Sequence, residues 1–169
     1  MLSVKMEKAI NEQINKELFS SYLYMAMSMY FEDGELSGAA SWMRVQAQEE
    51  LSHADKLMKY VNERGGRVVL EALEKPRTAW DTPLEACKEV LEHERFISAS
   101  INNLVQLARE ENDFMTDNFL QWYVSEQVEE EASAADVVRM FSLAGNAGGG
   151  LLMIDRELGS RVFNPPAAD

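Results

Sequence analysis

The sequence predicts an all-α fold in which four long helices form a bundle and a short fifth helix follows near the C-terminus. Ala, Leu, Met and Glu are plentiful, whereas the 169 residues include only 9 glycines and 4 prolines, and this balance favours helix. Apolar residues recur every three or four positions along four long stretches, and turn signals separate them. We expect one domain over residues 1–169, with the bundle at 3–144 and a C-terminal tail at 160–169, of which residues 164–169 are expected to be loose.

The first two helices are expected at residues 3–32 and 37–64, ending at Asp-Gly and Gly-Gly turns. The apolar stripe of the first helix is Met6, Ile10, Ile14, Leu18, Met25 and Met29. The inward face of the second helix holds Met43, Ala47, Ala54, Leu57 and Val61. Each stripe contains a carboxylate, Glu17 in the first and Glu50 in the second, and His53 lies at the edge of the second stripe.

Residues 65–81 form a long connection, which is unusual in a compact domain. A helix over 37–64 spans roughly 40 Å, and the extended connection reaches roughly 55 Å. The connection can therefore run the length of the bundle and leave the second and third helices parallel. Arg67–Leu70 is apolar enough to form either a short strand or an intersubunit contact.

The third helix opens with a capping box at 82–85, and the fourth is expected from a cap at Asp113 to about Leu143. The third seam reads Leu84, Cys87, Leu91, Glu94, Ser98, Ile101, Val105 and Ala108. The fourth reads Phe119, Tyr123, Gln127, Glu130, Ala134, Val137 and Phe141. His93 points off the seam and is interpreted as a surface histidine. A flexible break at 145–150 precedes the fifth helix, expected at about 151–158.

Polar residues recur in these seams with one spacing. Glu17 lies 33 residues before Glu50, and Glu94 lies 33 residues before Gln127. The pattern Glu…Glu-x-x-His of the first half, which ends at His53, therefore recurs as Glu…Gln-x-x-Glu in the second half. This repetition predicts two related helix pairs that face each other across a pseudo-twofold axis.

The four seams thus direct four carboxylates into one apolar interior, those of Glu17, Glu50, Glu94 and Glu130. No Lys or Arg occupies any of the four seams. An unpaired buried carboxylate is destabilising by several kcal/mol, so two divalent cations are expected among them. His53 adds one nitrogen ligand. Oxygen ligands with a single imidazole suit iron or manganese and leave positions open for dioxygen.

Neighbouring residues allow two interpretations. Tyr24 lies two helical turns after Glu17, where it can hydrogen-bond a ligand or donate an electron; a core tyrosine is the alternative. For Glu126, Glu129 and Glu131 taken singly, a solvated helix surface is as good an interpretation as metal binding.

Charge and cysteine content limit the partners. A net charge of −13 makes nucleic acid an unsuitable partner and favours cations. Cys87 is the only cysteine, so an intrachain disulfide or a cysteine-based metal site is excluded, and we interpret Cys87 as core filler. We expect no membrane span and no signal peptide, and hence a cytoplasmic location.

The motifs Glu50-Leu-Ser-His53-Ala, Glu92-His-Glu94 and Ser125-Glu-Gln-Val-Glu-Glu-Glu131 resemble those of prokaryotic non-haem ferritins, and the resemblance covers essentially the whole chain. It implies iron storage and detoxification in a cage of about 24 subunits, and ferroxidase activity that oxidises Fe(II) with dioxygen. The residues it implies are Glu17, Glu50 and His53 for a first iron; Glu50, Glu94 and Glu130 for a second; Gln127 as a hydrogen-bond partner; Glu49, Glu126 and Glu129, with Glu130, for a third; and Tyr24 and Trp122 as redox-active or positioning neighbours.

Departures from related families refine the expectation. Gln127-x-x-Glu130 replaces the second Glu-x-x-His of bacterioferritins, and Leu51 replaces their haem-binding methionine, so no haem is expected. A single cysteine excludes a rubrerythrin, and the fifth helix argues against a starvation ferritin. Two alternatives remain: a soluble di-metal carboxylate oxidase that acts on a small organic substrate, and a helical interaction module without chemistry.

Overall fold

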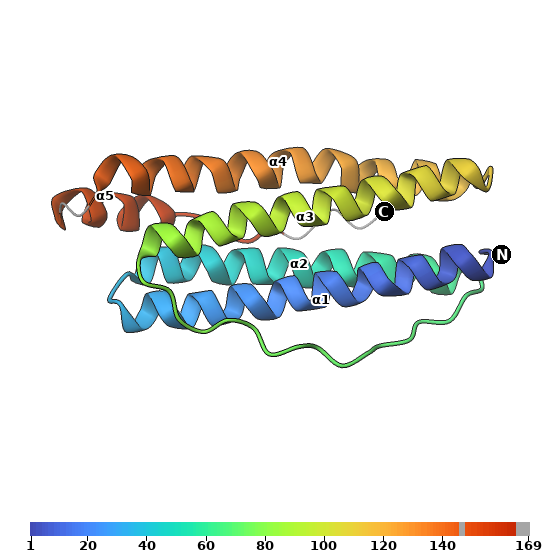
Figure 1. Ribbon diagram of the computed structural model, residues 1–169, viewed down its shortest axis with the longest axis horizontal. Coiled ribbons are helices and arrows are strands. Elements are labelled where there is room, and N and C mark those ends of the chain that lie inside the picture. The colour runs from blue at the N-terminus through green and yellow to red at the C-terminus, as the bar shows by residue number, and fades with distance from the viewer. Residues whose placement is uncertain (146–147, 165–169) are drawn as a thin grey trace.

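A computed structural model describes residues 1–145 and 148–164, and this part of the chain contains five helices and no strand (Figure 1). Their bounds are α1 Val4–Asp33, α2 Ser37–Glu63, α3 Pro83–Glu110, α4 Phe114–Ala144 and α5 Gly148–Leu158. The prediction of an all-α four-helix bundle with a short fifth helix is confirmed. Three helices begin at side-chain caps, because Ser3, Thr82 and Asp113 each accept a hydrogen bond from a backbone N–H of the first turn.

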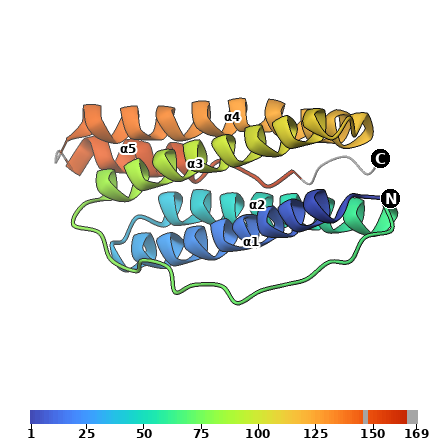
Figure 2. The same cartoon turned by 45° about the vertical axis from the view of Figure 1, so that its right-hand side comes forward.

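The bundle consists of two antiparallel hairpins, α1–α2 and α3–α4, joined by a crossover that runs along the outside of the molecule (Figures 1 and 2). The second and third helices are parallel, as the length of the connection predicted. Arg67–Leu70 forms no strand, so that alternative is wrong. Instead, the side chain of Asn11 on α1 hydrogen-bonds the carbonyl of Arg67 and the N–H of Val69, which fixes the crossover against the bundle.

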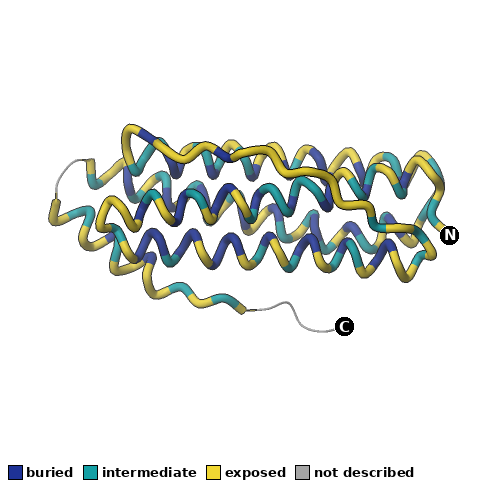
Figure 3. The backbone as a smooth tube through the Cα atoms, turned by 90° about the horizontal axis from the view of Figure 1, so that it is seen from below, coloured by how far each residue is buried: buried dark blue, intermediate teal, exposed yellow. Residues whose placement is uncertain are grey.

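Buried positions recur along the four long helices (Figure 3), and the apolar residues among them form two clusters, one toward each end of the bundle. Met27, Phe31 and Phe141 belong to the cluster beside α5, whereas Ile10 and Leu57 belong to the one near the N-terminus. Between them lies a buried polar layer of Gln13, Glu17, Gln46, Glu50, His53, Glu94, Gln127 and Glu130. The core therefore leaves a chemically distinct site in the middle of the bundle.

The expected apolar stripe of α1 is wrong at its C-terminal end. Met25 and Met29 are 41% and 46% exposed, while Leu23 and Met27 are buried in their place. Each step of four residues overshoots one helical turn by about 40°. Three such steps in succession, from Met6 onward, rotate the stripe away from the buried face.

Two further expectations need correction, and one is confirmed. His93 is not a freely exposed surface histidine: it is half-buried, and its Nε2 lies 2.7 Å from the hydroxyl of Ser20 on α1. The fifth helix begins at Gly148, so the break expected over 145–150 does not extend through 148–150; residues 146–147 lie outside the described residues. Cys87 is core filler as expected, and burial raises the pKa of its thiol to about 12.

Helix α5 docks on the start of α2 through a close backbone approach. The N–H of Ala39 donates a hydrogen bond to the carboxylate of Asp155 at 2.9 Å. A Cβ at Gly38 would lie 1.7 Å from the backbone oxygen of Asp155, so only glycine fits there. After α5 the chain passes a turn at residues 159–160 and continues along α2 in the direction of α5 (Figure 1). Residues 159–164 are called the return segment below.

Candidate metal centre

The polar layer brings together ligand-type side chains from all four long helices. Carboxylate oxygens of Glu17 on α1 and Glu50 on α2 and a ring nitrogen of His53 lie within 4.8 Å of one another, and all three residues are buried. Glu94 on α3 and Glu130 on α4 face the same interior: Glu94 is fully buried, and both raise the pKa of Glu50 by their charge. The five residues singled out from the seams thus converge.

Three carboxylate oxygens in this layer have no hydrogen-bond partner among the described residues. They are Oε2 of Glu17 and both Oε1 and Oε2 of Glu50. A buried polar atom without a partner costs about 1–3 kcal/mol, and more when it is charged. Oxygen atoms left unpartnered beside an imidazole nitrogen are a donor set that fits a divalent transition-metal ion.

The metal-free centre holds carboxyl groups that resist ionisation. Burial, followed by the charges of Glu94, Glu17 and Glu130, raises the pKa of Glu50 well above its usual range. Burial and the charge of Glu130 raise the pKa of Glu94 to about 8, although hydrogen bonds from Tyr24 and Gln127 oppose the rise. Cations that entered this layer would displace the protons and remove the repulsion.

Neutral donors orient three of the four carboxylates. Gln13 donates to Glu17 at 2.7 Å and Gln46 donates to Glu130 at 2.9 Å, while Tyr24 and Gln127 both donate to Glu94, Gln127 at 3.2 Å. Neutral donors fix the carboxylates in place and leave their negative charge uncompensated. The phenol of Tyr123 donates to the backbone oxygen of His53 at 2.8 Å and so positions that turn of α2.

The sequence patterns used above did not single out Gln13 and Gln46, although their spacing from the buried glutamates could have done so. Each precedes a buried glutamate, Glu17 or Glu50, by four residues and so lies on the same helix face. A search for amides one turn before each seam carboxylate would have found both.

Comparisons with known proteins agree with this geometry. A family model described as a ferritin-like domain matches residues 7–144. The chain belongs to the ferritin family. It is 45% identical over 161 residues to a bacterial non-heme ferritin of Bacteroides fragilis, covering 95% of this chain and all of the relative. It is 42% identical over 156 residues to one of Campylobacter jejuni, covering 92% of this chain and 93% of the relative.

Solved ferritin structures match the backbone closely. A closed form of the Archaeoglobus fulgidus ferritin, engineered by site-directed mutagenesis, superimposes with a TM-score of 0.96 at 52% identity and covers 97% of this chain and 100% of that one. A structure of the open pore ferritin of the same archaeon gives a TM-score of 0.95 at 52% identity over 96% of this chain and 100% of that one. In the described part of this ferritin-family chain, no helix is long and apolar enough to cross a membrane.

Acidic residues outside the four seam positions are placed unevenly in this ferritin-family chain. Glu126 joins His53 and Glu130 in a second group whose ligand atoms lie within 4.8 Å. Glu49 is turned toward Arg161, whose Nη2 lies 2.7 Å from its Oε2. Glu129 is exposed and belongs to neither of these groups. The structure thus brings Glu126, but not Glu129, to the centre.

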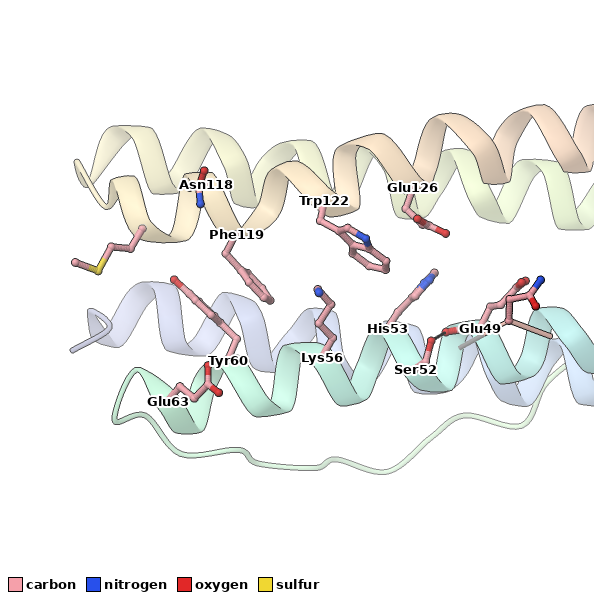
Figure 4. Close-up of a pocket in the computed structure, with 12 residues that line it drawn as sticks. Glu49, Ser52, His53, Lys56, Tyr60, Glu63, Asn118, Phe119, Trp122 and Glu126 are labelled. Carbon is pink, nitrogen blue, oxygen red and sulfur yellow. Dashed lines mark hydrogen bonds between the residues drawn. The ribbon is translucent and has the colours of Figure 1, made fainter. Parts of the chain in front are cut away.

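A groove between α2 and α4 leads to the centre. In the described residues no Cα of α2 comes within 8 Å of a Cα of α4, so side chains alone span the gap. The groove encloses about 630 Å³, and Figure 4 shows His53 from α2 and Trp122 from α4 pointing toward each other across it. Their rings meet edge to face with centroids 5.3 Å apart. Glu49 and Glu126 lie along the same groove, so the outer acids line a path from the ferritin centre to the surface.

Proposed function

We propose that this protein stores iron and that it oxidises Fe(II) with dioxygen at the centre inside the bundle. The observation that carries the proposal is the group of buried carboxylate oxygens on Glu17 and Glu50, left without partners beside His53. Family membership supports the same conclusion, because relatives at 42–45% identity are bacterial non-heme ferritins.

Fe(II) is the substrate in this proposal, and the residues have distinct roles. Glu17, Glu50 and His53 hold one ion, and Glu50, Glu94 and Glu130 hold the other. Carboxylates stabilise Fe(III) more than Fe(II), because Coulomb attraction grows with ion charge. Two Fe(II) ions give up one electron each, and dioxygen takes both electrons and two protons to form hydrogen peroxide. The protons that leave Glu50 and Glu94 when iron binds are available for this step.

Exposed apolar side chains on the bundle support association into a larger assembly. Tyr22, Met25 and Met29 on α1 are 41–49% exposed, and Leu51 and Val128 are more exposed still. Such surfaces are typical of contacts between subunits. We propose a homo-oligomeric cage of 24 subunits, about 460 kDa for chains of 19.1 kDa, which gives the ferric product an interior in which to mineralise. A cytoplasmic location suits the single buried cysteine, Cys87.

Iron oxidation is tested by loading Fe(II) without oxygen, admitting air and following ferric absorbance in the near ultraviolet. Wild type is expected to give a rapid rise, and Glu94→Ala to slow it by at least about tenfold, because a ligand matters more than the groups behind it. Glu12→Ala is the control, since Glu12 is an exposed residue of α1 paired with Lys8. Equal rates in the two variants would contradict the assignment of the centre.

A soluble di-metal oxidase acting on an organic substrate is the second candidate. The groove of about 630 Å³ beside His53 favours it, because Phe119 and Trp122 offer apolar surface within the groove. That function predicts a monomer or dimer. Size-exclusion chromatography separates the two candidates, since a 24-subunit cage elutes near 460 kDa.

A further inference from the structure

The return segment places one arginine over the face of α2 that leads to the centre. The guanidinium of Arg161 stacks on the indole of Trp42, 5.0 Å from the ring centroid, and also donates hydrogen bonds to Gln46 and Glu49. Trp42, Gln46 and Glu49 are spaced by four and three residues, so they form one stripe along the helix. The next residue of that stripe is His53, which belongs to the centre.

Arg161 reaches two of the acids that surround the outer end of the centre. It pairs with Glu49 directly, and it reaches Glu130 through Gln46, whose amide nitrogen donates to Glu130 at 2.9 Å. The Arg161 and Glu49 side chains are only 26% and 19% exposed, so water screens this pair less than it screens a surface pair. Arginine remains charged at all physiological pH values. A permanent positive charge therefore lies beside the position that an outer cation would occupy.

We propose that Arg161 competes for the Glu49 carboxylate with a cation at an outer position, which Glu126 and Glu130 form together with His53. In the metal-free state the guanidinium pairs with Glu49. A cation that binds in the outer position takes over the Glu49 carboxylate, and the guanidinium leaves. This inference rests on the proposed function, because it assumes that cations enter the centre.

The surroundings of Arg161 suit a local exchange of this kind. Helix α5 stays docked through Asp155 and Ala39, upstream of the segment that has to move. Gly159 lies against Gly38: a Cβ added at Gly159 would be 3.1 Å from the Cα of Gly38. This contact marks where the docked part of the chain ends. Displacement is thus confined to the residues after the turn. Competition keeps the outer position weak, which suits a place that ferric product passes through on its way out of the centre.

The experiment is a calorimetric titration of the metal-free protein with Zn²⁺, which binds oxygen and nitrogen ligands without redox change. Wild type is expected to show two tight cations per subunit and one weak cation. Arg161→Gln should tighten the weak class by about tenfold, because a positive neighbour is lost, and leave the tight classes unchanged. Arg156→Gln is the matched control: it removes the same charge from an exposed position on α5, and should behave as wild type.

A second readout follows the guanidinium itself. Because Arg161 stacks on Trp42, its departure should change the indole emission when the weak class fills, and only then. Trp42→Phe should abolish that change, which assigns it among the three tryptophans. Arg161→Lys keeps the charge but loses the two-pronged contact to Gln46 and Glu49, so its weak class should lie between those of wild type and Arg161→Gln.

The possible results distinguish a failure of the Arg161 proposal from a failure of the proposed function. If Arg161→Gln and Arg156→Gln give the same weak-class affinity, or if Arg161→Gln weakens that class, Arg161 is only a structural tie and the inference is wrong. The tight classes would still stand in that case. If wild type binds no Zn²⁺ in the tight classes, the proposed function is overturned and the inference with it.

Discussion

The phenol of Tyr24 on α1 donates a hydrogen bond to the carboxylate of Glu94 on α3, and both side chains are fully buried. The bond joins the two hairpins across the polar layer. It also favours the ionised form of Glu94. Burial and the charge of Glu130 act in the opposite direction and raise the pKa of Glu94 to about 8. Tyr24 therefore holds one carboxylate of the centre both in place and closer to its charged form.

Tyr24→Phe is expected to slow iron oxidation at neutral pH by about tenfold, because it removes a hydrogen bond to a charged group worth about 1.5–3 kcal/mol. Stopped-flow absorbance after mixing the Fe(II)-loaded protein with air measures the rate. Tyr30→Phe removes a phenol from the apolar cluster near α5 and serves as the control. The role given to Tyr24 fails if both variants oxidise iron at the same rate.

The metal-free protein is expected to lose stability as the pH rises from about 5 to 8. An acid whose pKa is raised in the folded state keeps its proton there after the unfolded chain has lost it, so unfolding becomes more favourable through that window. For Glu94 the window runs from the usual 4.5 to about 8, and the loss amounts to a few kcal/mol.

Thermal unfolding at a series of pH values checks this dependence. Glu94→Gln carries no titrating group at that position, so the metal-free variant should gain stability over wild type at pH 8 and match it near pH 4.5. Saturating Zn²⁺ should flatten the profile of wild type, because bound cations replace the protons. If the stability of metal-free wild type instead rises from pH 5 to 8, the raised pKa of Glu94 does not control the pH dependence.

Gly38→Ala is expected to undock α5 and to destabilise the fold by about 1–3 kcal/mol, the usual cost of forcing atoms into a packed contact. The added Cβ would meet the backbone of Asp155, which cannot move away as a flexible side chain can. Gly149→Ala is the control, because nothing lies within 4 Å of a Cβ at that position. Denaturant unfolding of both variants tests the difference; equal midpoints would contradict the close approach.

A partly buried ion pair ties the C-terminal end of α2 to the start of α4, at the end of the bundle far from α5. The Arg64 guanidinium contacts Asp113 at 3.0 Å and also donates to Tyr60 and Thr116, with both charged side chains about 15% exposed. Arg64→Met should destabilise the fold by about 3 kcal/mol, since it leaves Asp113 uncompensated. Arg139→Met breaks the exposed pair with Asp136 and should change the unfolding free energy by less than about 1 kcal/mol.

Local chemistry explains why much of the fold could be predicted from the sequence. Side-chain caps such as Thr82 and stops such as Gly34 act within one turn, and the helix bounds agree with the expected ones to within a few residues at all but the start of α5. The centre could be predicted as well, because Glu17 and Glu94 occupy seams with the same spacing to their partners. A repeated spacing between buried acids has few explanations other than a shared site.

Contacts between distant segments could not be predicted in this way. Arg161 follows α5 in a segment without periodicity, and its pairing with Glu49 joins residues 112 positions apart. His93 was placed by its own helix alone, whereas the neighbouring Ser20 comes from α1. Glu129 and Glu126 lie on the same helix, but Glu129 faces solvent whereas Glu126 lines the groove. In each case the partner belongs to another element, which the pattern of a single helix does not contain.

The repeat of the two hairpins is geometric but not chemical. A shift of 77 positions carries Glu17 onto Glu94, yet it carries the imidazole of His53 onto the carboxylate of Glu130. If iron binds there as proposed, the half of the centre that contains Glu130 would offer a ferric ion one more negative charge and would lower the reduction potential of that iron further. In the proposed centre, an iron held by Glu50, Glu94 and Glu130 would therefore lose its electron more readily than one held by Glu17, Glu50 and His53.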